Sequence, residues 1–131
     1  MIVDTSAVVA ILRNEPEASL FAHAIDQAET RKISAVSFVE AAVVIDGGRD
    51  PVASRKFDEL IRTAHLVVVP VCEEQARIAR EACRDYGKGT GHPARLNFGD
   101  CFAYALSRAT GEPLLFKGED FGHTDITPAL P

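Results

Sequence analysis

The chain has 131 residues, of which 47% are hydrophobic, and a formal net charge of −5. This length and composition suit one globular domain, expected over residues 1–131, and exclude a disordered chain. No apolar run approaches the roughly 18 residues of a membrane span, and the N-terminus lacks the basic segment of a secretion signal. We therefore expect a cytoplasmic protein without a membrane partner. The acidic charge argues against a simple basic nucleic-acid binder, although carboxylates gathered around a metal ion would account for much of it.

The three cysteines are Cys72, Cys83 and Cys101, and their spacing predicts neither a disulfide framework nor a zinc site. Cys72 and Cys83 fall in one predicted helix roughly 16 Å apart, which is too far for a bridge. Cys101 lies in an apolar stretch and is interpreted as a small core residue.

The first half of the chain predicts short strands alternating with helices. In chain order these are a strand from Met1 that ends at Asp4, a helix beginning at Thr5 or Ser6, a helix with Pro16 in its first turn, a strand at Lys32–Val36, a helix from Ser37 to Gly47-Gly48, and a helix opened by Asp50-Pro51. Ser37 and Glu40 have the spacing of a capping box.

The second half continues this alternation. Its expected elements are a strand at Leu66–Val69, a helix from Glu73 to Tyr86, a Gly-rich loop from Gly87 to Leu96, an apolar helix ending near Gly111, a strand at Pro113–Phe116 and a short last strand near Ile126. The β-branched run at Leu66–Val69 is expected to be buried on both faces. The pattern predicts an α/β fold, a three-layer sandwich with a central, mostly parallel sheet flanked by helices.

Four acidic residues, Asp4, Glu40, Asp100 and Asp120, fall at strand ends or helix starts that such a sheet brings to one edge. Each has a simpler explanation. Asp4 and Asp100 are candidate acids at helix starts. Glu40 is a candidate for half of a capping box, and Asp120 is a candidate turn residue. Taken together, four acids from four regions with no arginine partner favour a shared cation, because clustered carboxylates repel one another. Capping of the first helix then passes from Asp4 to Thr5 or Ser6.

Oxygen-only carboxylate ligands suit Mg²⁺ or Mn²⁺ rather than zinc or copper. One or two such ions activate water and stabilise the leaving oxygen in phosphodiester hydrolysis. The predicted chemistry is therefore metal-dependent hydrolysis without a covalent intermediate.

Four segments carry a resemblance to a known family: Met1–Ala7, Ser37–Glu40, Asn97–Ala105 and Lys117–Phe121. Together they resemble PIN-domain proteins and, most closely, the VapC toxins of bacterial type II toxin–antitoxin pairs, over nearly the whole chain. The resemblance implies a Mg²⁺-dependent endoribonuclease, with Mn²⁺ as an alternative. It also implies a homodimer that assembles with a VapB-type antitoxin, whose arginine would enter the acidic pocket.

By position, Asp4 and Asp100 resemble the main metal ligands of the family. Glu40 resembles the third acid, which binds metal or orients water, and Asp120 resembles the fourth. Many relatives have a hydroxyl residue and an earlier Asp where this chain has Phe116 and Gly118. Glu119 therefore stays an alternative to Asp120.

Basic residues supply candidate RNA contacts. The stripe of Arg77, Arg80 and Arg84 is interpreted as a solvated helix face. Better candidates for contacts with the RNA substrate are Lys88, His92 and Arg95 in the Gly-rich loop. Metal-ion hydrolysis requires no histidine base, and His23, His65 and His123 are interpreted as structural or surface residues.

A partner chain is expected to cover part of the apolar surface, which includes Leu12, Leu20, Phe21, Val43 and Val44. Two other enzyme or signalling classes are disfavoured. A receiver domain would end its central strand in an acid, where this chain has Pro70, and a haloacid-dehalogenase-type phosphatase would have Asp at position 6 instead of Ser. A catalytically silent PIN-type module that binds RNA or acts as a scaffold remains the alternative function.

Overall fold

In the computed structural model, which describes residues 1–131, four strands form one parallel sheet in the order β3-β2-β1-β4. The strands are short: β1 at Ile2–Val3, β2 at Lys32–Ser34, β3 at Val67–Val69 and β4 at Leu114–Leu115. Ile2 pairs with Lys32 on one side and with Leu114 on the other, so β1 is central. Because every strand is parallel, their carboxyl ends share one edge of the sheet.

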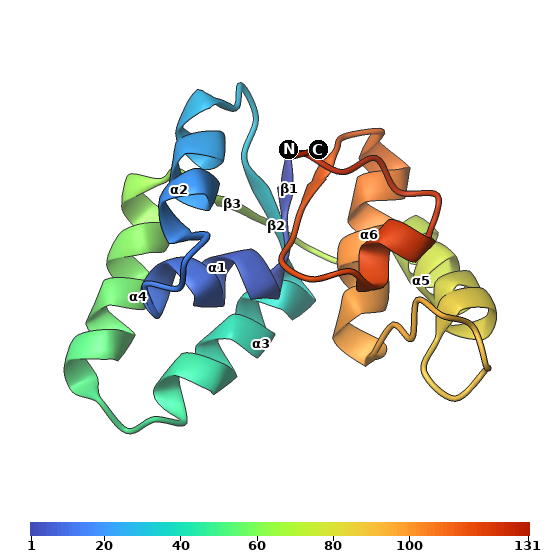
Figure 1. Cartoon of the computed structure of the whole chain (residues 1–131), viewed down its shortest axis with the longest axis horizontal. Helices are drawn as coiled ribbons and strands as arrows, with labels where there is room; N and C mark the ends of the chain where they lie inside the picture. The colour runs from blue at the N-terminus through green and yellow to red at the C-terminus, as the bar shows by residue number, and fades with distance from the viewer.

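Helices cover both faces of the sheet (Figure 1). On one face lie α1 (Thr5–Leu12), α2 (Ala18–Gln27), α3 (Ala35–Asp46) and α4 (Pro51–Thr63); on the other lie α5 (Glu73–Tyr86) and α6 (Phe98–Thr110). A 3₁₀ turn, η1 (Asp120–His123), follows β4. The predicted three-layer α/β sandwich is confirmed, and none of the helices is both long and apolar enough to cross a membrane.

Alternation along the strands separates the two cores. Met1 and Val3 pack with α1–α4, whereas Ile2 packs with α5 and α6. In β4, Leu115 likewise packs with α1–α4 and Leu114 packs with α5 and α6. Ile2, Val3 and Leu114 are completely buried, and burial of each such side chain contributes about 1.5–3 kcal/mol. The two-residue strands are therefore stabilised by both layers and not by their own length.

Three helix starts differ from the sequence prediction. Asp4 itself is the N-cap of α1, through a hydrogen bond from the Ser6 amide, so neither Thr5 nor Ser6 caps this helix. Ser34 caps α3 and lies three residues before the predicted cap, Ser37. The capping box of Ser37 with Glu40 was therefore wrong, because the strand β2 ends earlier than its apolar run. Pro16 lies before α2 instead of inside its first turn.

The prediction that β3 is buried on both faces was also wrong. Val67 and Val68 are 59% and 38% exposed, because β3 is an edge strand that pairs only with β2. The expected last strand near Ile126 is reduced to an isolated bridge between Pro128 and Leu114. Of the predicted excess apolar surface, Phe21 is a core residue, whereas Leu20, Val43 and Val44 are exposed.

Glu112 fixes the chain start at the end of the sheet opposite the acids. Its carboxylate accepts hydrogen bonds from the Met1 ammonium at 2.7 Å and from Lys32 Nζ at 2.6 Å, and also from the Thr30 hydroxyl. Burial raises the pKa of Glu112, but these hydrogen bonds outweigh it and lower the pKa to about 2. The contacts join β1, β2 and the segment before β4.

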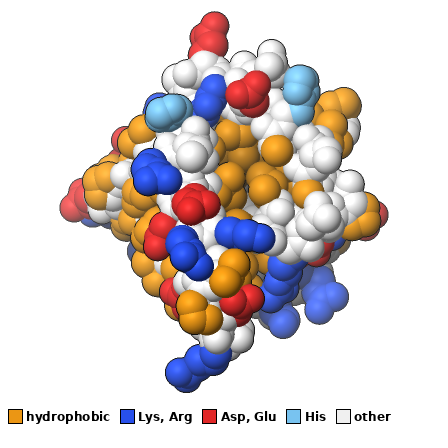
Figure 2. Space-filling view, turned by 90° about the vertical axis from the view of Figure 1, so that its left-hand side faces the viewer, with side chains coloured by type: hydrophobic (Ala, Val, Ile, Leu, Met, Phe, Trp, Pro, Cys, Tyr) orange, Lys and Arg blue, Asp and Glu red, His pale blue; other side chains and the backbone are white.

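The surface outside the acidic edge mixes both charge signs. Seen from the side of α2 and α4, basic and acidic side chains are interspersed on the surface, and apolar side chains gather near its centre (Figure 2). On α5, Arg77 pairs with Glu73 and Arg84 with Asp85, all on the exposed surface. This arrangement fits the interpretation of the arginine stripe as a solvated face.

Candidate active site

Asp4 stands at the carboxyl end of the central strand and is only 2% exposed. Its Oδ2 accepts hydrogen bonds from the Ser6 amide at 3.0 Å and the Ser6 hydroxyl at 2.6 Å. The same hydroxyl accepts a hydrogen bond from the Lys117 amide, at the end of β4. Oδ1 is buried without any hydrogen-bond partner. Burial raises the pKa of Asp4, although the hydrogen bonds of Ser6 oppose this. One carboxylate oxygen is therefore fixed and the other is free.

Glu40 reaches the same edge from α3. Its Oε1 lies 3.2 Å from the hydroxyl of Thr5, which is also 3.0 Å from the carbonyl of Ser37. Burial raises the pKa of Glu40, and the negative charge of Asp4 raises it further. Its carboxylate packs against Gly99 so closely that a side chain at position 99 would overlap it. The absence of a side chain at Gly99 thus allows α3 and α6 to approach closely at this point.

Asp100 lies in the first turn of α6, where it forms a capping box with Asn97. Asn97 Oδ1 accepts a hydrogen bond from the Asp100 amide at 2.8 Å, and Asp100 Oδ2 accepts one from the Asn97 amide at 3.0 Å. Burial raises the pKa of Asp100 to about 7, and the charges of Asp4, Glu40 and Asp120 contribute to the increase. Three other acids therefore act electrostatically on Asp100, although they come from distant parts of the chain.

Asp120 begins η1 and is exposed, as is Glu119 before it. Of these two, Asp120 is the acid whose charge raises the pKa of Asp100. Lys117, the nearest basic residue in sequence, does not neutralise this group. Its ammonium instead pairs with Glu15 at 3.3 Å and with Glu17 at 3.2 Å. The acids at the edge thus have no cationic side chain as a partner.

No three of these carboxylates converge on one point at metal-ligand distances as their side chains are placed. Asp100 Oδ2 is engaged in the capping box, and mutual repulsion favours separated rotamers. The donor set nevertheless fits a divalent cation. It consists of carboxylate oxygens alone, one of them the unpartnered and buried Oδ1 of Asp4. Ligation of one ion by several of these acids would require their side chains to rotate from the positions described.

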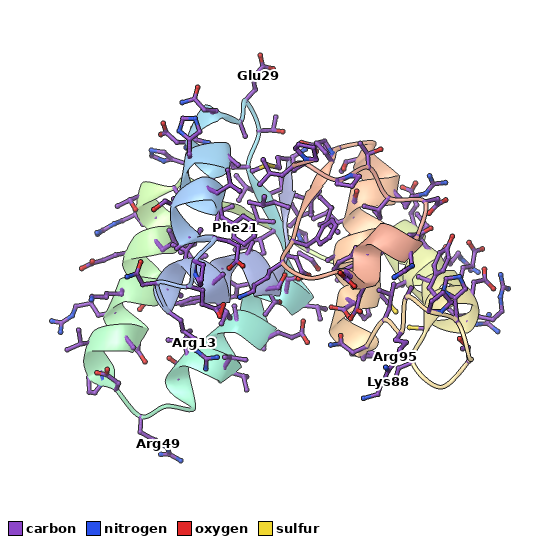
Figure 3. All side chains as sticks on the ribbon, viewed as in Figure 1. Arg13, Phe21, Glu29, Arg49, Lys88 and Arg95 are labelled. Atoms are coloured by element: carbon purple, nitrogen blue, oxygen red, sulfur yellow. The ribbon has the colours of Figure 1, made fainter.

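Two basic side chains lie near the N-terminal end of α6. Figure 3 shows Lys88 and Arg95 close together there, and the Lys88 amide donates to the Leu96 carbonyl at 2.8 Å. Both side chains are exposed. His92 is instead used locally, because its Nδ1 accepts from the Ala94 amide at 3.1 Å and its ring packs edge-on against Tyr86. Of the three candidate substrate contacts, Lys88 and Arg95 keep free charges.

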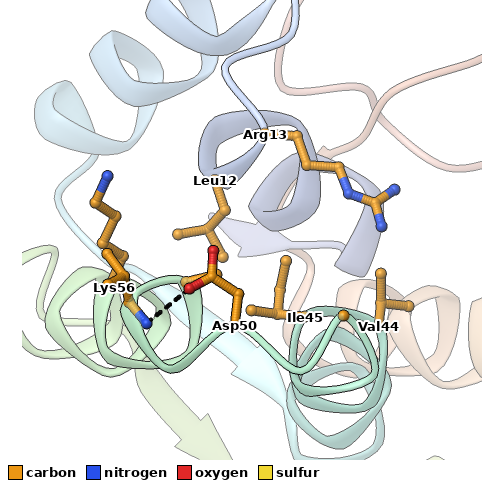
Figure 4. A pocket seen from close by; sticks show the side chains of 9 residues that line it. Leu12, Arg13, Val44, Ile45, Asp50 and Lys56 are labelled. Atoms are coloured by element: carbon orange, nitrogen blue, oxygen red, sulfur yellow. Dashed lines mark hydrogen bonds between the residues drawn. The ribbon is translucent and has the colours of Figure 1, made fainter.

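An apolar hollow lies next to the acidic site, and Glu40 and Thr5 form part of its lining. Val39, Val43 and Phe98 line it, and these side chains are 56%, 65% and 72% exposed. A separate hollow between α1, α3 and α4 is drawn in Figure 4. Its walls include Leu12, Arg13, Val44, Ile45 and Lys56, and Asp50 beside it caps α4 through the Val52 amide. That second hollow contains none of the four predicted site acids.

Sequence reasoning missed two supporting groups of the site. The Ser6 hydroxyl links Asp4 to the amide of Lys117, and Asn97 holds Asp100. The spacing of Asn97 to Asp100 is a capping pattern and would have revealed the second group. Nothing local in the sequence reveals the first, because its partners are separated by more than 100 residues.

Comparisons with known proteins identify the family of this chain. The PIN-domain family model matches residues 1–126. Ribonuclease VapC28 of Mycobacterium tuberculosis is 57% identical over 130 residues, which is 99% of this chain and 98% of the relative. Ribonuclease VapC42 of the same organism is 48% identical over 129 residues, covering 98% of each chain. The chain therefore belongs to the PIN-domain family, within its VapC branch.

Solved structures share the fold at low sequence identity. VapC20 of Mycobacterium tuberculosis, described as a toxin that cleaves the sarcin–ricin loop, superposes with a TM-score of 0.75 at 14% identity, over 96% of this chain and 95% of that one. A chain from a toxin–antitoxin complex of Klebsiella pneumoniae gives a TM-score of 0.69 at 14% identity, over 92% and 88% of the two chains. These structures support the architecture of the sheet and its helical layers.

Proposed function

We propose that this protein is a Mg²⁺-dependent endoribonuclease and the toxin of a toxin–antitoxin pair, with Mn²⁺ as an alternative metal. Its relatives over nearly the full chain are named ribonucleases, and it has an acid at each of the four predicted positions. The observation that carries the proposal is Oδ1 of Asp4. A buried carboxylate oxygen without a partner is costly unless a ligand satisfies it, and the charge of Asp4 contributes to the raised pKa of Asp100.

Asp4 and Asp100 are the proposed principal metal ligands, with Glu40 and Asp120 completing the acidic set. A bound divalent ion supplies Lewis acidity at the phosphate and acidifies water for attack. Ser6 keeps Oδ2 of Asp4 in place, so that Oδ1 stays directed to the site. Asn97 fixes the backbone of the first turn that carries Asp100. Glu40, whose carboxylate lies within hydrogen-bond distance of the Thr5 hydroxyl, is the proposed acceptor of a proton from the attacking water.

RNA is the proposed substrate, and Lys88 and Arg95 are its proposed phosphate contacts. The loop that carries them leads directly into α6 and Asp100. Cationic side chains at this position would offset the repulsion between the acids and the RNA backbone.

The test is RNA cleavage with the purified protein, in Mg²⁺ and in chelator, using structured RNA. Asp4→Asn and Asp100→Asn should each lower cleavage by at least about 100-fold, because each removes one charge from the metal site. Asp85→Asn, which changes an exposed acid on α5, is the matched control and should cleave normally. Cleavage in chelator by both site variants would overturn the mechanism.

The ends of the products test the nucleophile separately. Attack by water directed at the phosphate predicts 3′-hydroxyl and 5′-phosphate ends. Cyclic phosphate ends would show that the 2′-hydroxyl of the RNA attacks instead, and would contradict the proposed role of Glu40.

The alternative function is a silent RNA-binding or scaffold module. It is less well supported, because such a module needs no buried, unpartnered carboxylate oxygen at the strand edge. Binding of RNA that is unchanged by Mg²⁺ and by Asp4→Asn, with no cleavage of any RNA, would favour it.

A homodimer and a complex with a VapB-type antitoxin are the proposed assemblies. The exposed apolar side chains of Val39, Val43 and Phe98 next to the acids support a covering partner chain. Sedimentation of the isolated protein should give twice the monomer mass, and Val43→Asp should shift it toward monomer. A monomer at high concentration in the parent protein would contradict the dimer.

A further inference from the structure

Two cysteine thiols that the proposed hydrolysis does not use lie against each other between α5 and α6. Sγ of Cys83 is 2.8 Å from Sγ of Cys101, and both are free thiols. Cys83 is half-buried, whereas Cys101 is completely buried. The remaining cysteine, Cys72, is exposed in front of α5. Sequence spacing did not reveal this pair, because its two members come from different helices.

We propose that Cys83 and Cys101 form a redox modification site, at which a peroxide converts the two thiols into a disulfide. A disulfide bond is about 2.05 Å long, so bond formation requires the sulfurs to approach by less than about 1 Å. Packing of α5 against α6 already holds them together. The pair is therefore preorganised for closure, while Cys72 has no partner.

The reaction proceeds in two steps. Hydrogen peroxide oxidises the thiol of Cys83, the less buried of the two, to a sulfenic acid and releases one water. The sulfur of Cys101 then attacks the Cys83 sulfur, the S–O bond breaks, and the hydroxyl leaves as a second water with the Cys101 proton. Two thiols thus lose two electrons and two protons, and the peroxide is reduced to water. A thiol reductant reverses the bond by exchange.

The disulfide would change the segment that presents Asp100. It closes a loop over residues 84–100, which includes Lys88, Arg95 and the N-cap of α6. The Cys101 thiol also donates a hydrogen bond to the Asn97 carbonyl at 3.3 Å, and oxidation removes this donor. Oxidation therefore acts on the residue that holds Asp100, while the disulfide restrains the basic loop.

Peptide mapping tests the site without any assay of ribonuclease activity. Trypsin places each cysteine in its own peptide, Cys72 in Thr63–Arg77, Cys83 in Glu81–Arg84 and Cys101 in Leu96–Arg108. Stoichiometric peroxide should lower the intact mass by about 2 Da and link Glu81–Arg84 to Leu96–Arg108. Dithiothreitol should restore the separate peptides.

Stability provides a second readout. The oxidised protein should melt about 10 °C higher than the reduced protein, because the bridge within each chain restricts the unfolded state. Cys72→Ser should keep both effects, and Cys83→Ser should lose both. Three outcomes would overturn the proposal: no reaction, dimers linked through Cys72, or a gain of about 32 Da as sulfinic acid on Cys83. Each of them is independent of whether the protein cleaves RNA.

Discussion

Asp4 combines two roles, helix cap and candidate metal ligand, that its position in the sequence presents as alternatives. One carboxylate oxygen caps α1 through Ser6, and the other is left without a partner at the strand end. The cap holds the side chain in one rotamer, so the free oxygen is presented without further conformational cost. A helix cap at this position is therefore a means of orienting a ligand and not an argument against one.

The raised pKa of Asp100 leads to a prediction for the metal-free protein. The folded state binds this proton more tightly than the unfolded chain does, so the contribution to stability is complete below about pH 4 and is lost as pH rises through about 7. Asp100→Asn removes the charge and should stabilise the metal-free protein at pH 8 by about 1–2 kcal/mol.

Thermal unfolding in chelator between pH 4 and pH 8 measures this effect. The advantage of Asp100→Asn should be larger at pH 8 than at pH 4. Asp85→Asn, which changes an exposed acid on α5 outside this set, is the control and should show no such pH-dependent advantage. An advantage that does not depend on pH would contradict the electrostatic explanation.

Gly99 offers a second residue-level prediction. A methyl group there would overlap the carboxylate of Glu40 and displace that flexible side chain from the site. Gly99→Ala should therefore reduce RNA cleavage by at least about tenfold while changing the free energy of unfolding by less than about 1 kcal/mol. Gly122→Ala is the matched control, because nothing lies within reach of its added methyl group. Equal activity of the two variants would show that the position of Glu40 does not matter.

Among the secondary-structure elements, the apolar runs predicted most of the helices and strands. The errors arose where tertiary position overrides a local pattern. The run from Leu66 to Val69 looks buried by composition, but β3 is exposed because it occupies the sheet edge. Ser37 has a capping pattern but lies inside α3, completely buried. Strand order and the exact end of β2 depend on contacts between distant segments, which one sequence does not display.

In the candidate site, too, some features could be predicted from the sequence and others depend on tertiary contacts. Strand ends in a parallel sheet converge by topology, so the acids at positions 4, 40 and 100 could be grouped from sequence, and their charges do act on one another. The links from Ser6 to Lys117 and from Cys83 to Cys101 could not be predicted. Each depends on the rotamers of side chains that meet only after the layers have packed.

Glu112 leads to a prediction about how the strands are held together, because it joins β1, β2 and the segment before β4. Its pKa is lowered in the folded protein, so its contribution to stability is present above about pH 4.5 and is lost as pH falls toward about 2. Glu112→Gln should lower the free energy of unfolding at pH 7 by about 2 kcal/mol. Chemical denaturation at pH 7 and pH 2.5 would measure the change, with Glu119→Gln as the exposed control. An equal loss of unfolding free energy at the two pH values would contradict the ionic explanation.

In the molecule as a whole, two helical layers pack against a four-stranded sheet. At one edge of this sheet, several negatively charged side chains lie near enough to repel one another. A divalent cation that binds only the folded protein should relieve this repulsion and raise the melting temperature. We expect Mg²⁺ at ten times its dissociation constant to contribute about 1.4 kcal/mol, a shift of several degrees. Asp4→Asn should abolish the shift, whereas Asp85→Asn should keep it. An unchanged shift in Asp4→Asn would place the cation elsewhere.

The pairing of β1 with β4 also has a consequence for the order of synthesis. Asp4 is among the first residues made, yet the Leu115 carbonyl that accepts from its amide and the Lys117 amide that donates to Ser6 are made more than 100 residues later. Such long-range pairing closes late in folding. The acidic edge is therefore incomplete on a nascent chain, so a ribosome would finish nearly the whole protein before its product acquired the geometry proposed for cutting RNA.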